Sequence, residues 1–143
     1  MLASAVVIGI AQPAQACGME EPGRQFIRAM NDAQKIQLAQ HQQFATSLAQ
    51  LDIPMATPKL YKFSVEAGDA IAFHYALPDI PDIPIPTFVG GIARGEDGHI
   101  ATIVCRVPDS VTYLPYLPIW QDNSWKCAPQ TDNVSGDRCF PLK

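Results

Sequence analysis

The sequence predicts an α+β fold in which one long N-terminal helix packs on an antiparallel sheet of about four strands. Residues 24–53 contain neither proline nor glycine, which favours an uninterrupted helix. After Pro58 apolar and polar residues alternate, as they do in strands with one buried face. From Pro108 onward frequent prolines and two cysteines predict a disulfide-closed loop. The 143 residues, of which 48% are hydrophobic, suffice for a single modest core.

The predicted helix spans residues 20–43. Glu20 and Glu21 stand where the positive end of the helix dipole favours carboxylates. One face at helical spacing carries Phe26, Ala29, Met30, Ala33, Ile36 and Phe44, together with Gln37 and Gln40. These glutamines indicate a helix boundary that is only partly dry. A short second helix is predicted over residues 46–51, with Thr46 or Ser47 as its N-cap.

The sheet is predicted between residues 59 and 107. The segments "KLYKFSVEAG" and "AIAFHYAL" form one hairpin around Gly68, and "PTFVGGIAR" and "HIATIVCRV" form another around residues 95–98. Gly90 and Gly91 lie in a strand pattern and indicate a bulge or a close approach of another part of the chain. The intervening "PDIPDIPIP" is predicted to be an extended edge or loop, because repeated proline removes ladder donors.

Residues 108–143 are predicted to form an irregular loop held by a disulfide. The four cysteines are Cys17, Cys105, Cys127 and Cys139, and four cysteines allow three pairings. A bond between Cys105 and Cys127 would close a Pro-rich loop and stabilise the fold by about 3 kcal/mol in the chain-entropy model. Cys139 is an alternative partner for Cys127 or for Cys17, so the pairing stays open.

The N-terminal residues 1–16 are predicted to be a signal peptide, which leaves residues 17–143 as a single exported domain. The apolar run at residues 2–11 is shorter than the roughly 20 residues of a membrane span. Ala14 and Ala16 fit the small-residue positions of a signal-peptidase site. A plain secretory cut is favoured over lipidation of Cys17, since Ala14 fits a lipoprotein site poorly; a lipid tether is the alternative. The expected location is the periplasm, the cell surface or the medium.

Composition argues against several classes of function. A net charge of −4 and a pI near 5.2 do not suit a phosphate-binding surface, so no nucleic acid is expected. His41, His74 and His99 lack the spacing of a metal site or catalytic pair. Asp79 and Asp82 are candidate calcium ligands, but solvated loop carboxylates are the more common case. We therefore expect no catalytic residues, no metal and no cofactor.

Four separated blocks of sequence resemble the type IV pilin-like G and H family of cyanobacteria. The blocks are "AMNDAQKIQLAQHQQFATSLAQL", "YKFSVEA", "FVGGIA" and "ATIVC", and the similarity extends over residues 24–127. The matching positions are Met30, Asn31, Ala33, Gln34, residues 44–47, residues 89–91 and Cys105. The resemblance implies a helix lying across an antiparallel sheet, with its Phe and Ala side buried.

Residues 1–23 depart from the N-terminus of a pilin. A pilin begins with Phe and an early Glu inside a continuous apolar helix, whereas this apolar run holds no Glu and is followed by Pro13 and Gly18. The resemblance therefore implies the globular head of a pilin, exported and either soluble or lipid-tethered. It also implies a non-catalytic structural or accessory role, such as a minor pilin, with other pilin-like or envelope proteins as partners.

An alternative hypothesis is a stand-alone secreted or lipid-anchored module that binds a glycan or a peptide. Its candidate surface is the aromatic set Tyr113, Tyr116, Trp120 and Trp125 in the C-terminal loop. Aromatic rings in a closed loop provide a stacking surface. The same residues equally form a small satellite core beneath a long loop, which is the more common outcome.

Overall fold

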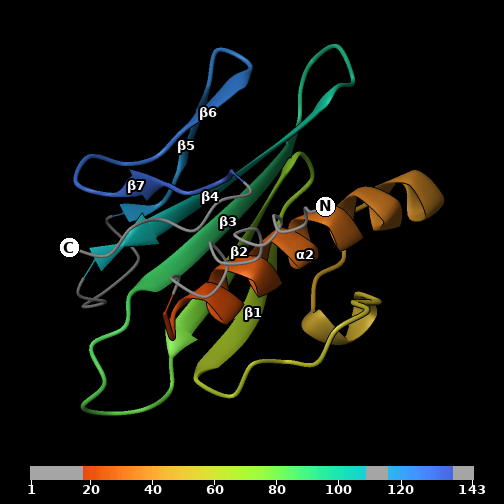
Figure 1. The fold of residues 1–143 in the computed structure, drawn as a ribbon. Coiled ribbons are helices and arrows are strands. Elements are labelled where there is room, and N and C mark those ends of the chain that lie inside the picture. The colour runs from red at the N-terminus through yellow and green to blue at the C-terminus, as the bar shows by residue number, and fades with distance from the viewer. Residues whose placement is uncertain (1–17, 109–115, 137–143) are drawn as a thin grey trace, which may run out of the picture.

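A single long helix lies across one face of an antiparallel sheet (Figure 1). The computed structural model describes residues 18–108 and 116–136. The predicted signal peptide, Cys17, Tyr113 and Cys139 lie outside these residues. The elements are α2 (Glu21–His41), η2 (Leu48–Gln50), β1 (Tyr61–Ala67), β2 (Ile71–Pro78), β3 (Thr87–Arg94), β4 (Ile100–Val107), β5 (Ile119–Gln121), β6 (Ser124–Lys126) and β7 (Asp132–Asn133). Within the described residues, no helix is both long and apolar enough to cross a bilayer.

The main sheet has five antiparallel strands in the order β1-β2-β3-β4-β7. The first four are the strands that the alternating pattern predicts. The prediction of an irregular C-terminal loop is wrong in part, because β5 and β6 form a separate hairpin and β7 adds to the edge of β4. Strands of two or three residues are too short for an alternation to be recognised. The hairpin turn does have a sequence signal, because Asp and Asn tolerate the positive φ that two-residue turns of type I′ require. Asp122 and Asn123 both have positive φ.

Helix α2 ends where the backbone of Gln42 becomes left-handed, with φ of 63°. The Gln42 N–H then donates to the Leu38 carbonyl, which satisfies one of the last helical acceptors. The predicted second helix is reduced to the single 3₁₀ turn η2. The expected cap does not form through Ser47, and the Thr46 N–H instead donates to Oε1 of Gln50 at 2.7 Å.

The core between α2 and the sheet is formed mainly by aromatic and aliphatic side chains. Its buried members are Phe26, Ile27, Met30, Ala33, Ala45, Leu51, Tyr61, Ala76, Ile85, Phe88, Val104 and Val134. The predicted apolar face is wrong at Ile36, whose side chain is 58% exposed. The buried stripe instead runs through Ile27, Asn31, Gln34 and Leu38, and Ile36 lies about 200° around the helix from Gln34.

Gly90 and Gly91 mark close approaches on the two faces of β3. The register of β3 with β4 is continuous there, so no bulge forms. A Cβ at Gly90 would lie 2.5 Å from Cγ2 of Ile27 in α2, and a Cβ at Gly91 would lie 2.8 Å from the Trp125 ring. Both faces of β3 are therefore covered, which explains why seven of its eight residues are buried.

The second face of the sheet is covered by part of the C-terminal segment. A disulfide joins Cys105 of β4 to Cys127, which is one of the pairings that the sequence leaves open. Closing a loop over a sequence separation of 22 stabilises the fold by about 3 kcal/mol in the chain-entropy model. Nearby, Tyr75, Val89 and Val107 are buried, and Phe73, Leu77, Tyr116 and Leu117 pack against them.

Charged side chains connect the start of α2 to the C-terminal segment. The guanidinium of Arg24, 2% exposed, donates to the carboxylate of Glu21 and, through Nη1, to the carbonyls of Val134 (2.9 Å) and Gly136 (2.6 Å). Arg106 of β4 donates from Nε to Glu20 at 3.0 Å. Buried ions are tolerated only with such complete pairing.

The close contact at Gly90 leads to the first prediction. Gly90→Ala should lower the free energy of unfolding by about 1–3 kcal/mol, because Ile27 is fully buried and cannot move aside. Gly68→Ala is the control, since its nearest atom would be the Ile71 oxygen at 3.6 Å, an ordinary contact. Urea unfolding of both variants measures the difference. Equal stability of Gly90→Ala and wild type would contradict this packing.

Candidate functional site

Three polar side chains meet in the core between α2 and β2. His74 and Gln34 are fully buried, and Asn31 is 3% exposed. Nδ1 of His74 lies 2.8 Å from Oδ1 of Asn31, and Nε2 of His74 lies 3.2 Å from Nε2 of Gln34. We call these three residues the His74 cluster.

The backbone around the His74 cluster determines which groups donate. The Ala45 N–H donates to Oε1 of Gln34, and Nε2 of Gln34 donates to the Ala45 carbonyl, so the Gln34 amide has one orientation. Nδ2 of Asn31 donates to the carbonyl of Ile103, which turns Oδ1 toward the imidazole. His74 must therefore donate from Nδ1 and accept at Nε2, which is a neutral tautomer.

Burial lowers the pKa of His74 to about 3, because the charged ring would lose its hydration. Protonation at Nε2 would also place a new N–H against the amide donor of Gln34. Both ring nitrogens already have partners within the protein. The cluster is thus suited to holding the helix on the sheet rather than to general-base catalysis.

The other two histidines lie on other parts of the fold, with other partners. His41 is exposed in the last turn of α2. His99 follows the β3–β4 turn, where its ring bonds the carboxylate of Asp97 and lies 6.2 Å from the Trp120 ring. Hydrogen bonds from His99 lower the pKa of the exposed Asp97 carboxyl. The structure therefore does not bring the three histidines together.

The aromatic residues proposed as a binding surface divide between two packing environments. Trp120 and Trp125 are opposite each other on β5 and β6, with ring centroids 5.2 Å apart. Trp125 donates from Nε1 to the Ala101 carbonyl at 2.9 Å and contacts the edge of Phe73. Tyr116 packs with the cluster around Val89. Trp125 and Tyr116 thus help to cover the second face of the sheet, as a satellite core would.

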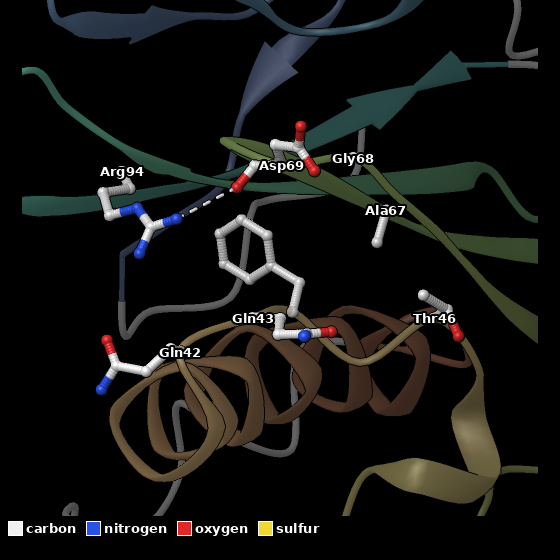
Figure 2. Close-up of a pocket in the computed structure, with 8 residues that line it drawn as sticks. Gln42, Gln43, Thr46, Ala67, Gly68, Asp69 and Arg94 are labelled. Atoms are coloured by element: carbon white, nitrogen blue, oxygen red, sulfur yellow. Dashed lines mark hydrogen bonds between the residues drawn. The ribbon is translucent and has the colours of Figure 1, made fainter.

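A groove opens between the end of α2 and the β1–β2 turn (Figure 2). Its volume is about 350 Å³, and its lining residues are Gln42, Gln43, Phe44, Thr46, Ala67, Gly68, Asp69 and Arg94. Figure 2 shows the Arg94 guanidinium reaching the backbone of Asp69, where Nη2 donates to the carbonyl at 3.3 Å. The polar groups that line the groove are two side-chain amides, one hydroxyl, one carboxylate and one guanidinium. No nucleophile–base pair is among them. This groove suits polar contact more than chemistry.

The two candidate calcium ligands lie in different surroundings. Asp79 lies 3.8 Å from Nζ of Lys62, while Asp82 has a positive φ of 70° in the following loop. No group of three or more His, Cys, Asp or Glu side chains within residues 18–108 and 116–136 is arranged to hold a metal ion. The geometry therefore offers no support for a calcium site there.

Sequence reasoning named the three residues of the His74 cluster separately and missed that they meet. Asn31 and Gln34 share a helical stripe with Ile27 and Leu38, and His74 alternates with Ala72 and Ala76 on the helix-facing side of β2. A polar residue at a core position on each of two elements indicates that the two residues bond each other, because buried polar groups need partners. Sequence alone does not show that the two positions meet.

Comparison with known proteins identifies one family. The family model described as type IV pilin-like G and H matches residues 20–128, which is more than half of the chain. No curated protein and no solved structure matches. The matched region includes α2, the four long strands and both cysteines of the disulfide.

The neutral His74 predicts a stability loss in mild acid. Its folded pKa lies below the unfolded value near 6.5, so the unfolded chain takes up the proton first and stability falls as the pH drops below 6.5. Between pH 7 and pH 5 this group should cost about 2 kcal/mol of unfolding free energy. Urea unfolding at several pH values should show this slope in His41→Gln and not in His74→Gln. A slope that persists in His74→Gln would contradict the assignment.

Proposed function

Because this chain belongs to the type IV pilin-like G and H family, we propose that it is a non-catalytic, exported accessory protein of a cyanobacterial cell envelope. It acts through contacts with other pilin-like or envelope proteins, as a minor pilin does. The observation that carries the proposal is the family match over the region that folds as helix on sheet. Pilin-type proteins are structural, and protein contact is their ordinary work.

The chemistry of the described residues supports a structural role. His74, whose pKa is lowered by burial, is enclosed in the core and bonded by two side-chain amides. The buried arginine Arg24 is saturated by a carboxylate and two carbonyls. Polar groups that are fully satisfied inside the fold rigidify it and are unavailable to a substrate.

Export is part of the proposal. Residues 1–16 act as the signal peptide, and cleavage after Ala16 leaves a mature domain of residues 17–143. A disulfide between Cys105 and Cys127 is consistent with an oxidising compartment such as the periplasm. Cys17 is then the first mature residue, with a lipid tether as the alternative to a free N-terminus.

Fractionation of the native host tests the role. The protein should co-purify with surface filaments that are sheared from the cells, and it should be absent from that fraction in cells that lack filaments. A cytoplasmic enzyme serves as the control for lysis. Release as a free protein that binds polysaccharide, with none in the filament fraction, would contradict the proposal and favour the glycan-binding alternative.

Intact-mass measurement tests export separately. The mature protein should have the mass of residues 17–143, less two hydrogens for each disulfide, of which the bond between Cys105 and Cys127 is one. Ala16→Arg should leave the precursor uncut, because signal peptidase needs a small residue there. Cys17→Ser separates the two kinds of processing, since it prevents acylation and leaves a plain secretory cut in place. An acyl mass on Cys17 would replace the plain cut by the lipid tether.

A further inference from the structure

Strand β1 forms one outer edge of the main sheet. Its register with β2 is shown by two bonds at its ends, from the Gly68 N–H to the Ile71 carbonyl and from the Asp79 N–H to the Leu60 carbonyl. Bonding in an antiparallel pair alternates along each strand. The backbones of Lys62, Ser64 and Glu66 therefore bond β2, and those of the residues between them point away from the sheet.

Within the part of the chain that the structure describes, the outward N–H and carbonyl groups of β1 have no hydrogen-bond partner along most of the strand. Among the described residues, no hydrogen bond reaches the N–H or the carbonyl of Phe63, Val65 or Ala67, and these residues are half-exposed. The row of outward backbone groups ends at Tyr61, which is 4% exposed because its own chain covers it. The opposite edge differs, because β7 has only two residues. An open edge of this kind is a template for another strand.

The side chains of β1 have a charge order that is complementary to itself. Phe63 faces α2, where its ring centroid lies 4.4 Å from that of Phe26, so Lys62, Ser64 and Glu66 lie on the other face. All three are exposed. A two-fold axis through Ser64 exchanges Lys62 with Glu66. From this symmetry we propose that β1 pairs antiparallel with β1 of a second copy of the chain, centred on Ser64.

The backbone accepts this register without change. Centring on Ser64 places Phe63 opposite Val65 of the second copy, and both have outward N–H and carbonyl groups. The two symmetric pairs form four hydrogen bonds, since each exchanges two. Lys62 then lies opposite Glu66 of the second copy at a non-hydrogen-bonded position, where side chains are closest. Both requirements are met by the same register.

Of the two-fold registers that place outward groups opposite each other, only the one centred on Ser64 sets Lys62 opposite Glu66. Centring on Phe63 would place Lys62 opposite Ser64, and centring on Val65 would place Ser64 opposite Glu66, so neither register forms an ion pair. A pair centred on Lys62 would place two lysines opposite each other, and a pair centred on Glu66 would oppose two carboxylates. Like charges directly across a ladder are destabilising. The charge order therefore favours the alignment centred on Ser64, because this alignment alone forms ion pairs across the ladder.

The contacts that these charges make within the chain leave them available. Lys62 is 75% exposed and lies 3.8 Å from Asp79, a long and solvated ion pair. Glu66 accepts a bond from the Tyr75 hydroxyl through Oε1, which leaves Oε2 for a lysine. Neither contact has to break.

The pair would be weak and would join two sheets into one. Helix α2 packs chiefly over β2, β3 and β4, and the two-fold axis is perpendicular to the sheet, so both helices lie on one face of the combined sheet. Only a short stretch of edge is buried, which is typical of transient contacts. The inference depends on β1 alone and goes beyond the proposed function, since it holds for filament proteins and binding modules alike.

Charge reversal tests the pairing on the whole chain. Sedimentation velocity at low salt over a range of concentrations should show a monomer–dimer equilibrium for wild type. Lys62→Glu and Glu66→Lys should each weaken it by about tenfold or more, because two symmetric ion pairs become repulsive. An equimolar mixture of the two variants should restore a dimer, and so should the double variant K62E/E66K. Lys35→Glu, on the exposed face of α2, is the control and should behave as wild type.

Amide hydrogen exchange locates the interface. Raising the concentration should slow exchange at Phe63 and Val65, whose N–H groups point outward, and leave Ser64 unchanged because it already bonds β2. A wild-type protein that stays monomeric would overturn the proposal. A dimer that is indifferent to both charge reversals, or that protects other residues, would overturn it equally. None of these results bears on fractionation with filaments, so the two proposals can fail independently.

Discussion

The placement of α2 on the sheet depends on a neutral imidazole held between two amides. Apolar packing alone would let a helix slide or rotate by small steps over β2 and β3, at modest cost in buried area. The His74 cluster removes that freedom, because Asn31 also bonds Ile103 of β4 and Gln34 also bonds Ala45 beyond the helix. One set of donors and acceptors thus ties together two strands, the helix and the chain that follows it. A shift in any of them would leave buried polar groups unpaired.

The central strands owe their burial to two coverings of different kinds. On one face α2 approaches β3 at Gly90, and on the other the Trp125 ring approaches at Gly91. The first covering is continuous with the long helix, whereas the second is a short hairpin that would have little stability by itself. The bond between Cys105 and Cys127 links that hairpin covalently to β4. The apolar cluster around Val89 on that second face is thereby held in place by a covalent constraint as well as by its own packing.

Much of the fold could be predicted from sequence because its main elements are long and periodic. The helix, the four long strands and the turns around Gly68 and Gly98 follow from proline and glycine placement and from alternation. The face of α2 was predicted less well, since Ile36 is apolar and exposed while Gln34 is polar and buried. Hydrophobic pattern assigns core positions by residue type, and here hydrogen bonds to a distant strand decide them. The hairpin of β5 and β6 was missed because each strand has three residues.

The ion pairs around Arg24 and Arg106 lie at one end of the domain, so its two ends differ in character. They gather the beginning of α2, the end of β4 and the carbonyls of Val134 and Gly136 at one pole. The groove beside Gln43 and Arg94 lies at the opposite pole, with the end of α2 and the β1–β2 turn. An anchor attached at either extremity of the described chain would therefore hold the domain at this same end. The groove would then lie at the end of the domain farthest from that anchor.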